Sequence, residues 1–238
     1  MGFATNVRKK IGHGGHYVPQ LAQLIVQSNV KFNLKGIAIW RSAIRGFQSR
    51  ACTFVTSQLE KELSDFTDPY NVIGDELKEK EDVCARENTQ EYLNRKDVQK
   101  ALHAQLLGFN QWSLCRSNSI LRYDLKNEEI PTIGVVGSLV KSGIRALVYS
   151  GDQDAVIPFT GTRTLVNGLA KELGLKTTVP YRPWFEGKQV GGWTQVYGNI
   201  QLSFASVRGA SHKVPVAQPA RSLVLFKAFL AGKPLPEA

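Results

Sequence analysis

Residues 144–158, IRALVYSGDQDAVIP, combine a strand signal with two aspartates that follow it directly. The run from Ile144 to Ser150 is apolar and rich in β-branched and aromatic side chains, which is typical of a buried strand. A helix is predicted over 132–141, before this strand, and another over 159–173, after the aspartate loop. This alternation of helix and strand predicts an α/β layered fold.

The other predicted elements extend that alternation along the chain. They are a helix over 18–30, a strand over 33–40, two short helices over 89–106 that meet near Asn94, a hairpin over 177–197 with its turn at 186–188, a strand over 202–207 and a helix over 217–230. Pro19 is predicted at the first position of the first helix. Residues 41–82 are polar and charged, with helices expected around 51–63, and are predicted to be an insertion or cap. We predict one domain, 1–238, with a largely parallel sheet.

Two loops after predicted strands carry side chains that could take part in catalysis. Asp152 and Asp154 follow the strand that ends at Ser150, and His212 follows the strand that ends near Val207. In open α/β sheets such loops meet at the carboxyl ends of the strands. An acid followed by a histidine is the order used by α/β-hydrolases, in which the histidine carries the proton and the acid orients it.

The composition excludes several classes of function. The net charge is +10, but the densest basic run, Arg8-Lys9-Lys10, is short and has no interleaved aromatic residues, so nucleic acid is not a predicted partner. No apolar run approaches the roughly 18 residues of a membrane span, and the first ten residues resemble no signal peptide, so no membrane association is predicted. Cys52, Cys84 and Cys115 lack the paired spacing of a zinc site, and no cofactor or metal is predicted.

Several motifs occur in a fixed order: GGHYVP at 14–19, YSGDQDAVIP at 149–158, Trp184 with GGW at 191–193, and VRGASHKVP at 207–215. Together they resemble the serine carboxypeptidase family, and in particular the plant serine carboxypeptidase-like proteins. The resemblance covers about 82 to the C-terminus, and also 14–39. It implies an incomplete α/β-hydrolase: the C-terminal part of the central sheet, flanking helices and a reduced cap. It also implies that Asp154 is the triad acid, His212 the base and Asp152 a structural residue.

The nucleophile implied by the resemblance is absent. The family's elbow is Gly-Glu-Ser-Tyr-Ala/Gly-Gly-His-Tyr-Val-Pro, and counting back from the matched tail places Gly12 at the serine. Ile11 replaces the glutamate that binds the substrate's carboxylate, and His13 replaces the tyrosine. No other Gly-x-Ser-x-Gly occurs. An alternative, in which His13-Gly14-Gly15 is a lipase-type oxyanion loop, stays open, but the continued match into Tyr17-Val18-Pro19 favours a remnant of the elbow.

Other departures from the family affect the surroundings of the site. The family has a buried strand before the elbow, whereas residues 5–10 are polar and cationic, and most of its helical lid lacks a counterpart after Trp40. Lys213 replaces a usual glutamate and is expected to disfavour a charged His212. Each cysteine resembles one half of a different family disulfide, so no native bridge is expected.

Three interpretations follow from the resemblance. The chain is an enzyme, either a carboxypeptidase or an acyltransferase; or it is a non-catalytic product, from a truncated gene model or a pseudoenzyme; or a separate N-terminal chain complements it. The resemblance implies a peptide or acyl substrate. Family members are secreted or vacuolar, whereas the sequence as written has no signal peptide, so the expected location is cytoplasmic or stays unknown.

Overall fold

The computed structural model describes residues 14–28, 32–40, 85–104, 111–113, 131–155 and 157–238. The chain divides into two compact units, Met1–Lys10 with Asp75–Leu125, and Ile11–Gly74 with Lys126–Ala238. In the described ranges, no helix is both long enough and apolar enough to cross a membrane.

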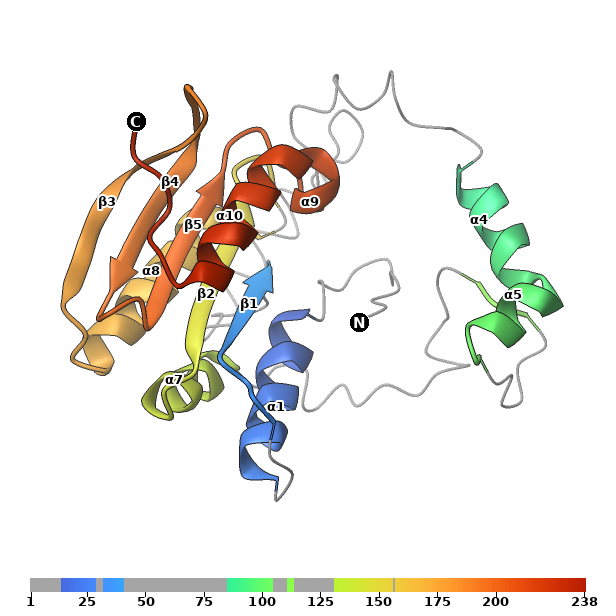
Figure 1. Cartoon of the computed structure of the whole chain (residues 1–238), viewed down its shortest axis with the longest axis horizontal. Coiled ribbons are helices and arrows are strands. Elements are labelled where there is room, and N and C mark those ends of the chain that lie inside the picture. The colour runs from blue at the N-terminus through green and yellow to red at the C-terminus, as the bar shows by residue number, and fades with distance from the viewer. Residues whose placement is uncertain (1–13, 29–31, 41–84, 105–110, 114–130, 156) are drawn as a thin grey trace, which may run out of the picture. The chain divides into compact units, whose positions relative to one another are not determined.

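Within these ranges, the second unit contains one mixed sheet of five strands (Figure 1). They are β1 (Gly36–Trp40), β2 (Arg145–Gly151), β3 (Thr177–Glu186), β4 (Gln189–Tyr197) and β5 (Leu202–Val207), in the order β1-β2-β5-β4-β3. β1, β2 and β5 are parallel, whereas β4 is antiparallel to both of its neighbours. The prediction of a largely parallel sheet is therefore wrong, because the hairpin of β3 and β4 joins the same sheet.

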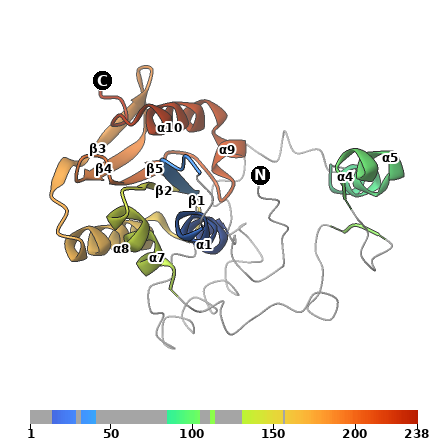
Figure 2. The same cartoon turned by 60° about the horizontal axis from the view of Figure 1, so that its bottom comes forward.

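Helices cover both faces of this sheet (Figure 2). One face carries α1 (Gly14–Gln27), α7 (Ile133–Lys141) and α8 (Phe159–Glu172), and the other carries α9 (Val214–Ala217) and α10 (Pro219–Ala231). Two clusters of buried apolar residues lie on the two faces of the sheet, and successive side chains of β2 alternate between them. Val148 packs on the α7–α8 side, and Leu147 packs on the α10 side. β2 is therefore buried on both faces, as its apolar sequence predicts.

The hairpin is fixed by one tryptophan and the two glycines opposite it. Trp184 is completely buried, and its indole N–H donates to the backbone oxygen of Ser206 in β5 at 2.9 Å. A Cβ at Gly191 would collide with the Trp184 ring, and one at Gly192, whose φ is +153°, would collide with the Ser206 backbone. The glycines therefore make room for the indole and draw β4 towards β5.

The described part of the first unit is a helix pair. α4 (Ala85–Asn94) and α5 (Lys96–Ala101) meet at Asn94, as predicted. The Asn94 side-chain amide donates to the backbone oxygens of Gln90 at 2.7 Å and Trp112 at 2.9 Å, and its oxygen accepts from the Trp112 N–H at 2.7 Å. Asn94 thus ends α4 and ties the corner to a residue 18 positions away.

Some sequence predictions fall outside the described residues. These are the cap over 41–82, the helices around 51–63, Gly12 at the serine position, and the three cysteines, Cys52, Cys84 and Cys115.

Candidate active site

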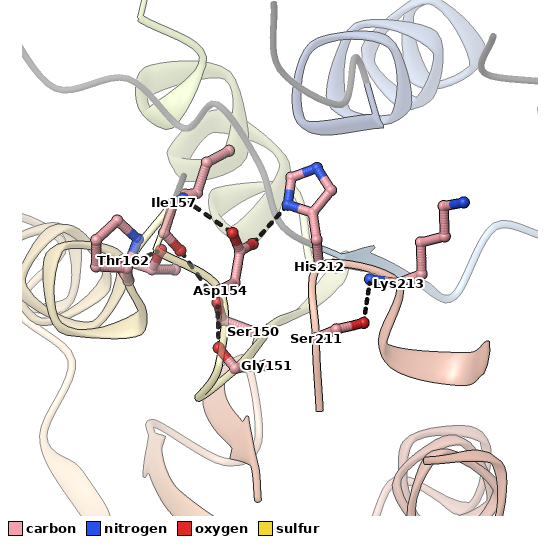
Figure 3. Close-up of polar contacts among 9 residues, drawn as sticks. Ser150, Gly151, Asp154, Ile157, Thr162, Ser211, His212 and Lys213 are labelled. Atoms are coloured by element: carbon pink, nitrogen blue, oxygen red, sulfur yellow. Dashed lines mark hydrogen bonds and ion pairs between the residues drawn. The ribbon is translucent and has the colours of Figure 1, made fainter. Parts of the chain in front are cut away.

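The structure brings the predicted acid and base together at the carboxyl ends of β2 and β5 (Figure 3). Oδ2 of Asp154 lies 2.7 Å from Nδ1 of His212, and both residues are buried. The other carboxylate oxygen of Asp154 accepts a hydrogen bond from the Ile157 N–H at 3.2 Å. The carboxylate is therefore held from two sides, and Nδ1–H is the tautomer that such a contact favours. In this tautomer Nε2 is the ring nitrogen that would receive a proton.

Asp152 ties the acid loop to the base loop. Its Oδ1 accepts hydrogen bonds from the Gly209 N–H at 2.8 Å and from the Gln153 side-chain amide at 2.9 Å. Its backbone N–H donates to the Val207 oxygen at 3.2 Å. These contacts agree with the structural part predicted for Asp152, since the hydrogen bonds of its side chain go to Gly209 and Gln153.

Gly151 allows the two loops to come this close. A Cβ at Gly151 would overlap the backbone oxygens of Ala210 and Ser211, the two residues before His212. The Gln153 N–H then donates to the Ala210 oxygen at 3.0 Å. The distance between Asp154 and His212 therefore depends on the absence of a side chain at Gly151. The sequence carries this signal in the glycine that ends the predicted strand, but nothing local identifies its partner.

The base loop is also held from α10. Gly209 has a φ of +66°, in the left-handed region, and its backbone oxygen accepts from the Gln218 side-chain amide at 3.1 Å. The Arg221 guanidinium donates to the Arg208 oxygen at 2.6 Å. His212 is thus placed by a loop that has hydrogen bonds both to the aspartate loop after β2 and to α10.

Ser211 is the hydroxyl next to the base in sequence, but its contacts are structural. It is buried, and its Oγ accepts a hydrogen bond from the Lys213 N–H at 3.2 Å (Figure 3). The Lys213 side chain is exposed, so solvent and salt screen its charge from His212. The proposed repulsion between the two side chains remains a prediction.

The helix that contains the matched tail of the elbow motif, α1, starts earlier than the sequence predicts. Pro19 is the sixth residue of α1 and not the first, so the expectation of Pro19 at the helix start is wrong. A proline there cannot donate to the backbone oxygen of Gly15, four residues before it. The buried Thr132 hydroxyl donates to that oxygen instead, at 2.9 Å. A residue just before α7 therefore satisfies the acceptor that Pro19 leaves open.

The described residues contain no group of three or more His, Cys, Asp or Glu side chains that could hold a metal. The arrangement that the structure does show is an oriented imidazole beside a buried carboxylate, in loops at the carboxyl edge of an α/β sheet. An acid and a base in an α/β-hydrolase site are arranged in this way.

Comparison with known proteins supports that class and narrows it. The fold is similar to the crystal structure of Kex1(Δ)p, a prohormone-processing carboxypeptidase from Saccharomyces cerevisiae, with a TM-score of 0.55 at 16% identity, over 94% of this chain and 48% of that one. The family model for serine carboxypeptidase matches residues 47–232. The chain is 49% identical to Serine carboxypeptidase-like 45 and to Serine carboxypeptidase-like 46 of Arabidopsis thaliana, over 94% of its length. The chain belongs to the serine carboxypeptidase family.

The chain spans 61% of the length of each of these two relatives. The alignment to the first runs over 285 residues, whereas 94% of 238 residues supplies about 224, so about 60 aligned positions of the relative have no counterpart here.

Proposed function

We propose that this chain is a non-catalytic member of the serine carboxypeptidase family, which keeps the acid and the base of the family's site but forms no acyl-enzyme. The observation that carries the proposal is Gly12, which stands at the serine position of the elbow motif. Glycine has no side chain that could attack a carbonyl carbon. The acid–base geometry supports the other half of the proposal, since Asp154 and His212 lie in hydrogen-bond contact.

The family reaction defines what is lost. A serine oxygen attacks the carbonyl carbon while the histidine takes the serine proton, and the aspartate holds the imidazole in the correct tautomer. Asp154 and His212 can still hold and orient a proton. Without the nucleophile no covalent intermediate forms, and turnover is expected to fall by about a millionfold relative to a complete site. The peptide and acyl substrates of the family are then ligand classes for binding and not for turnover.

A fluorophosphonate probe tests the proposal. The probe reacts with a serine that a neighbouring histidine activates, so we expect no covalent labelling of the 238-residue chain, as measured by intact-mass spectrometry. A serine carboxypeptidase in the same reaction is the positive control. Labelling of the chain that disappears in the His212→Ala variant would overturn the proposal, because it would show a working nucleophile.

A second candidate is an active carboxypeptidase or acyltransferase whose longer product contains this sequence. The coverage of only 61% of the relatives favours keeping this candidate. Sequencing of the transcript decides between the two: an in-frame Gly-Glu-Ser-Tyr codon series ahead of Gly14 supports the active product, and a transcript that encodes the residues up to Gly12 as they stand here supports the non-catalytic one.

A further inference from the structure

The base loop, which runs from Arg208 to His212, begins with two residues whose backbone polar groups are all paired. The Arg208 N–H donates to the Gly191 oxygen of β4 at 2.8 Å, and the Arg208 oxygen accepts from Arg221 of α10. The N–H and the oxygen of Gly209 pair with the acid loop and with α10, as described above. Since three different elements hold these two peptide groups, they fix the direction in which the chain leaves β5.

The contact from Arg221 is the shortest of the four. Its Nη1 donates to the Arg208 oxygen at 2.6 Å, and a charged donor makes a stronger hydrogen bond than a neutral one. Arg221 is the third residue of α10, and its side chain is only 18% exposed. A helix therefore presents this charge to the base loop from a fixed position.

The same guanidinium lies close to the turn of the β3–β4 hairpin. Its Nε is 4.0 Å from Oε2 of Glu186, the last residue of β3. Glu186 pairs with Gln189 across the two-residue turn Gly187-Lys188, so the register of the hairpin fixes its place. In the described part of the chain, the buried Nε of Arg221 has no hydrogen-bond partner. The attraction between Arg221 and Glu186 is therefore the charge interaction on that side of the guanidinium.

The position of the imidazole depends on where the base loop starts. His212 comes three residues after Gly209, and its Nδ1 lies 2.7 Å from Oδ2 of Asp154 (Figure 3). Asp154 belongs to the other loop, where the Ile157 N–H holds it. If the base loop started about 1 Å further away, this contact would exceed the usual length of a hydrogen bond.

We infer that Arg221 is a positioning residue for His212, which it places against Asp154 by holding the Arg208 oxygen, and that Glu186 acts on the imidazole through Arg221. The turn of the β3–β4 hairpin is then linked to the acid–base pair. This inference goes beyond the proposed function. It concerns the placement of the imidazole and needs no nucleophile, so the result of fluorophosphonate labelling does not affect it.

NMR of the full chain with ¹⁵N-labelled histidine tests the link. The chain has four histidines, and the His212→Gln variant identifies the Nδ1 proton signal of His212. In Arg221→Ala this proton should exchange with water about tenfold faster than in the unchanged chain, because a loosened base loop opens more often. The measurement is made where urea denaturation shows both proteins to be fully folded.

Arg145→Ala is the matched control for Arg221→Ala. Arg145 also donates from Nη1 to a backbone oxygen of α10, that of Phe229 at 3.1 Å, but it is the first residue of β2, at the other end of the strand from the acid loop. Its loss should lower the free energy of unfolding and leave the exchange of the His212 proton unchanged. Equal acceleration in both variants would overturn the inference, because the effect would then follow overall stability.

Glu186→Gln tests the second half of the inference with a smaller change. It keeps the length of the side chain and removes its charge, so the His212 proton should exchange about threefold faster, as suits a partly exposed ion pair. Glu237→Gln is the control. It removes a carboxylate that pairs with Arg182 of the same hairpin at 3.0 Å, and it should have no effect on this proton.

A double-mutant cycle shows whether Glu186 acts through Arg221. In the Arg221→Ala background, Glu186→Gln should cause no further acceleration. An equal effect in both backgrounds would overturn the link to the hairpin turn. Unchanged exchange in Arg221→Ala, or the absence of a protected Nδ1 proton from the unchanged chain, would overturn the positioning role itself.

Discussion

The acid–base loops and the α1–β1 region belong to one sheet and its covering helices, but they are supported differently. The strands that carry Asp154 and His212 each have two neighbours, and their loops are joined by hydrogen bonds from Asp152 and Gln153. β1 has one described neighbour, and the helix before it exposes large apolar side chains such as Leu24.

Because the two regions are supported differently, a well-ordered contact between Asp154 and His212 does not by itself imply catalytic activity. The hydrogen bonds described above for Asp154, His212 and their loops join residues of the stretch from the end of β2 to α10. The resemblance to the family places the nucleophile position, Gly12, in the sequence just before α1. A well-formed acid–base pair is therefore evidence of family membership and of local packing, and is no evidence of a complete triad.

The largest effect is expected from Trp184→Ala, which tests whether the hairpin supports the acid–base region. The buried indole fills the space above Gly191 and bonds to the Ser206 oxygen, so its loss should lower the free energy of unfolding by about 3 to 5 kcal/mol. Urea denaturation measures the change. Trp193→Ala is the control, because Trp193 is 37% exposed. It should lower the free energy of unfolding clearly less than Trp184→Ala does. Equal costs would mean that the indole does not anchor the hairpin.

A smaller effect is expected from Gly151→Ala, which tests the close approach of the two loops. The new Cβ would meet the Ala210 and Ser211 oxygens, so the loops must separate, at a cost of about 1 to 3 kcal/mol in unfolding free energy. The hydrogen-bonded Nδ1 proton of His212 should also disappear from the NMR spectrum. Gly161→Ala in α8 is the control: its Cβ would meet nothing within 4 Å, and a gain of about 0.5 to 1 kcal/mol is expected there.

Much of the fold could be predicted from the sequence because its signals are local. The strand over 202–207 and the hairpin turn at 186–188 lie where apolar patterning and turn residues place them. Asn94 marks the corner between two short helices, as a side chain that competes for backbone hydrogen bonds often does. Asp154 and His212 each follow a predicted strand, and loops after parallel strands meet at the carboxyl ends of a sheet. The structure brings the two side chains into contact there.

The features that could not be predicted are pairings across long stretches of chain. The bond from Gly209 to Asp152 spans 57 positions, and neither residue type indicates its partner. The hairpin's place beside β5 depends on Trp184 and Ser206 in the same way. The position of Pro19 inside α1 breaks the usual preference of proline for helix starts, and the residue that makes it tolerable, Thr132, is far away in sequence.

Tyr149 lies in β2, between the acid–base loops and β1, and should make the free energy of unfolding depend on pH. Burial raises the pKa of Tyr149 to about 12, above the value near 10 of an exposed phenol. The unfolded chain therefore loses this proton first, and stability that is full below about pH 10 should fall by about 2 kcal/mol as the pH rises to about 12. Urea denaturation between pH 9 and 12 should show a smaller loss in Tyr149→Phe. Identical pH profiles for the two proteins would refute this assignment.

The smallest effect is expected from Thr132→Val, which tests how α1 is attached to the rest of the fold. Removing the hydroxyl leaves the Gly15 oxygen without the 2.9 Å bond described above, at a cost of about 1 kcal/mol in unfolding free energy. Thr164→Val is the control. The exposed Thr164 hydroxyl donates to the Thr160 oxygen one turn earlier in α8, so its loss should change the free energy of unfolding little.

The hydrogen bond between Thr132 and the Gly15 oxygen can also be tested by changing Pro19, the residue that leaves this oxygen open. In a Pro19→Ala background, residue 19 regains an N–H that can donate to the Gly15 oxygen, so Thr132→Val should then cost less than it does beside the proline. A double-mutant cycle by urea denaturation measures this coupling. Additive effects would mean that Pro19 and Thr132 act independently, and that the hydroxyl stabilises α1 by packing and not by replacing the missing helix bond.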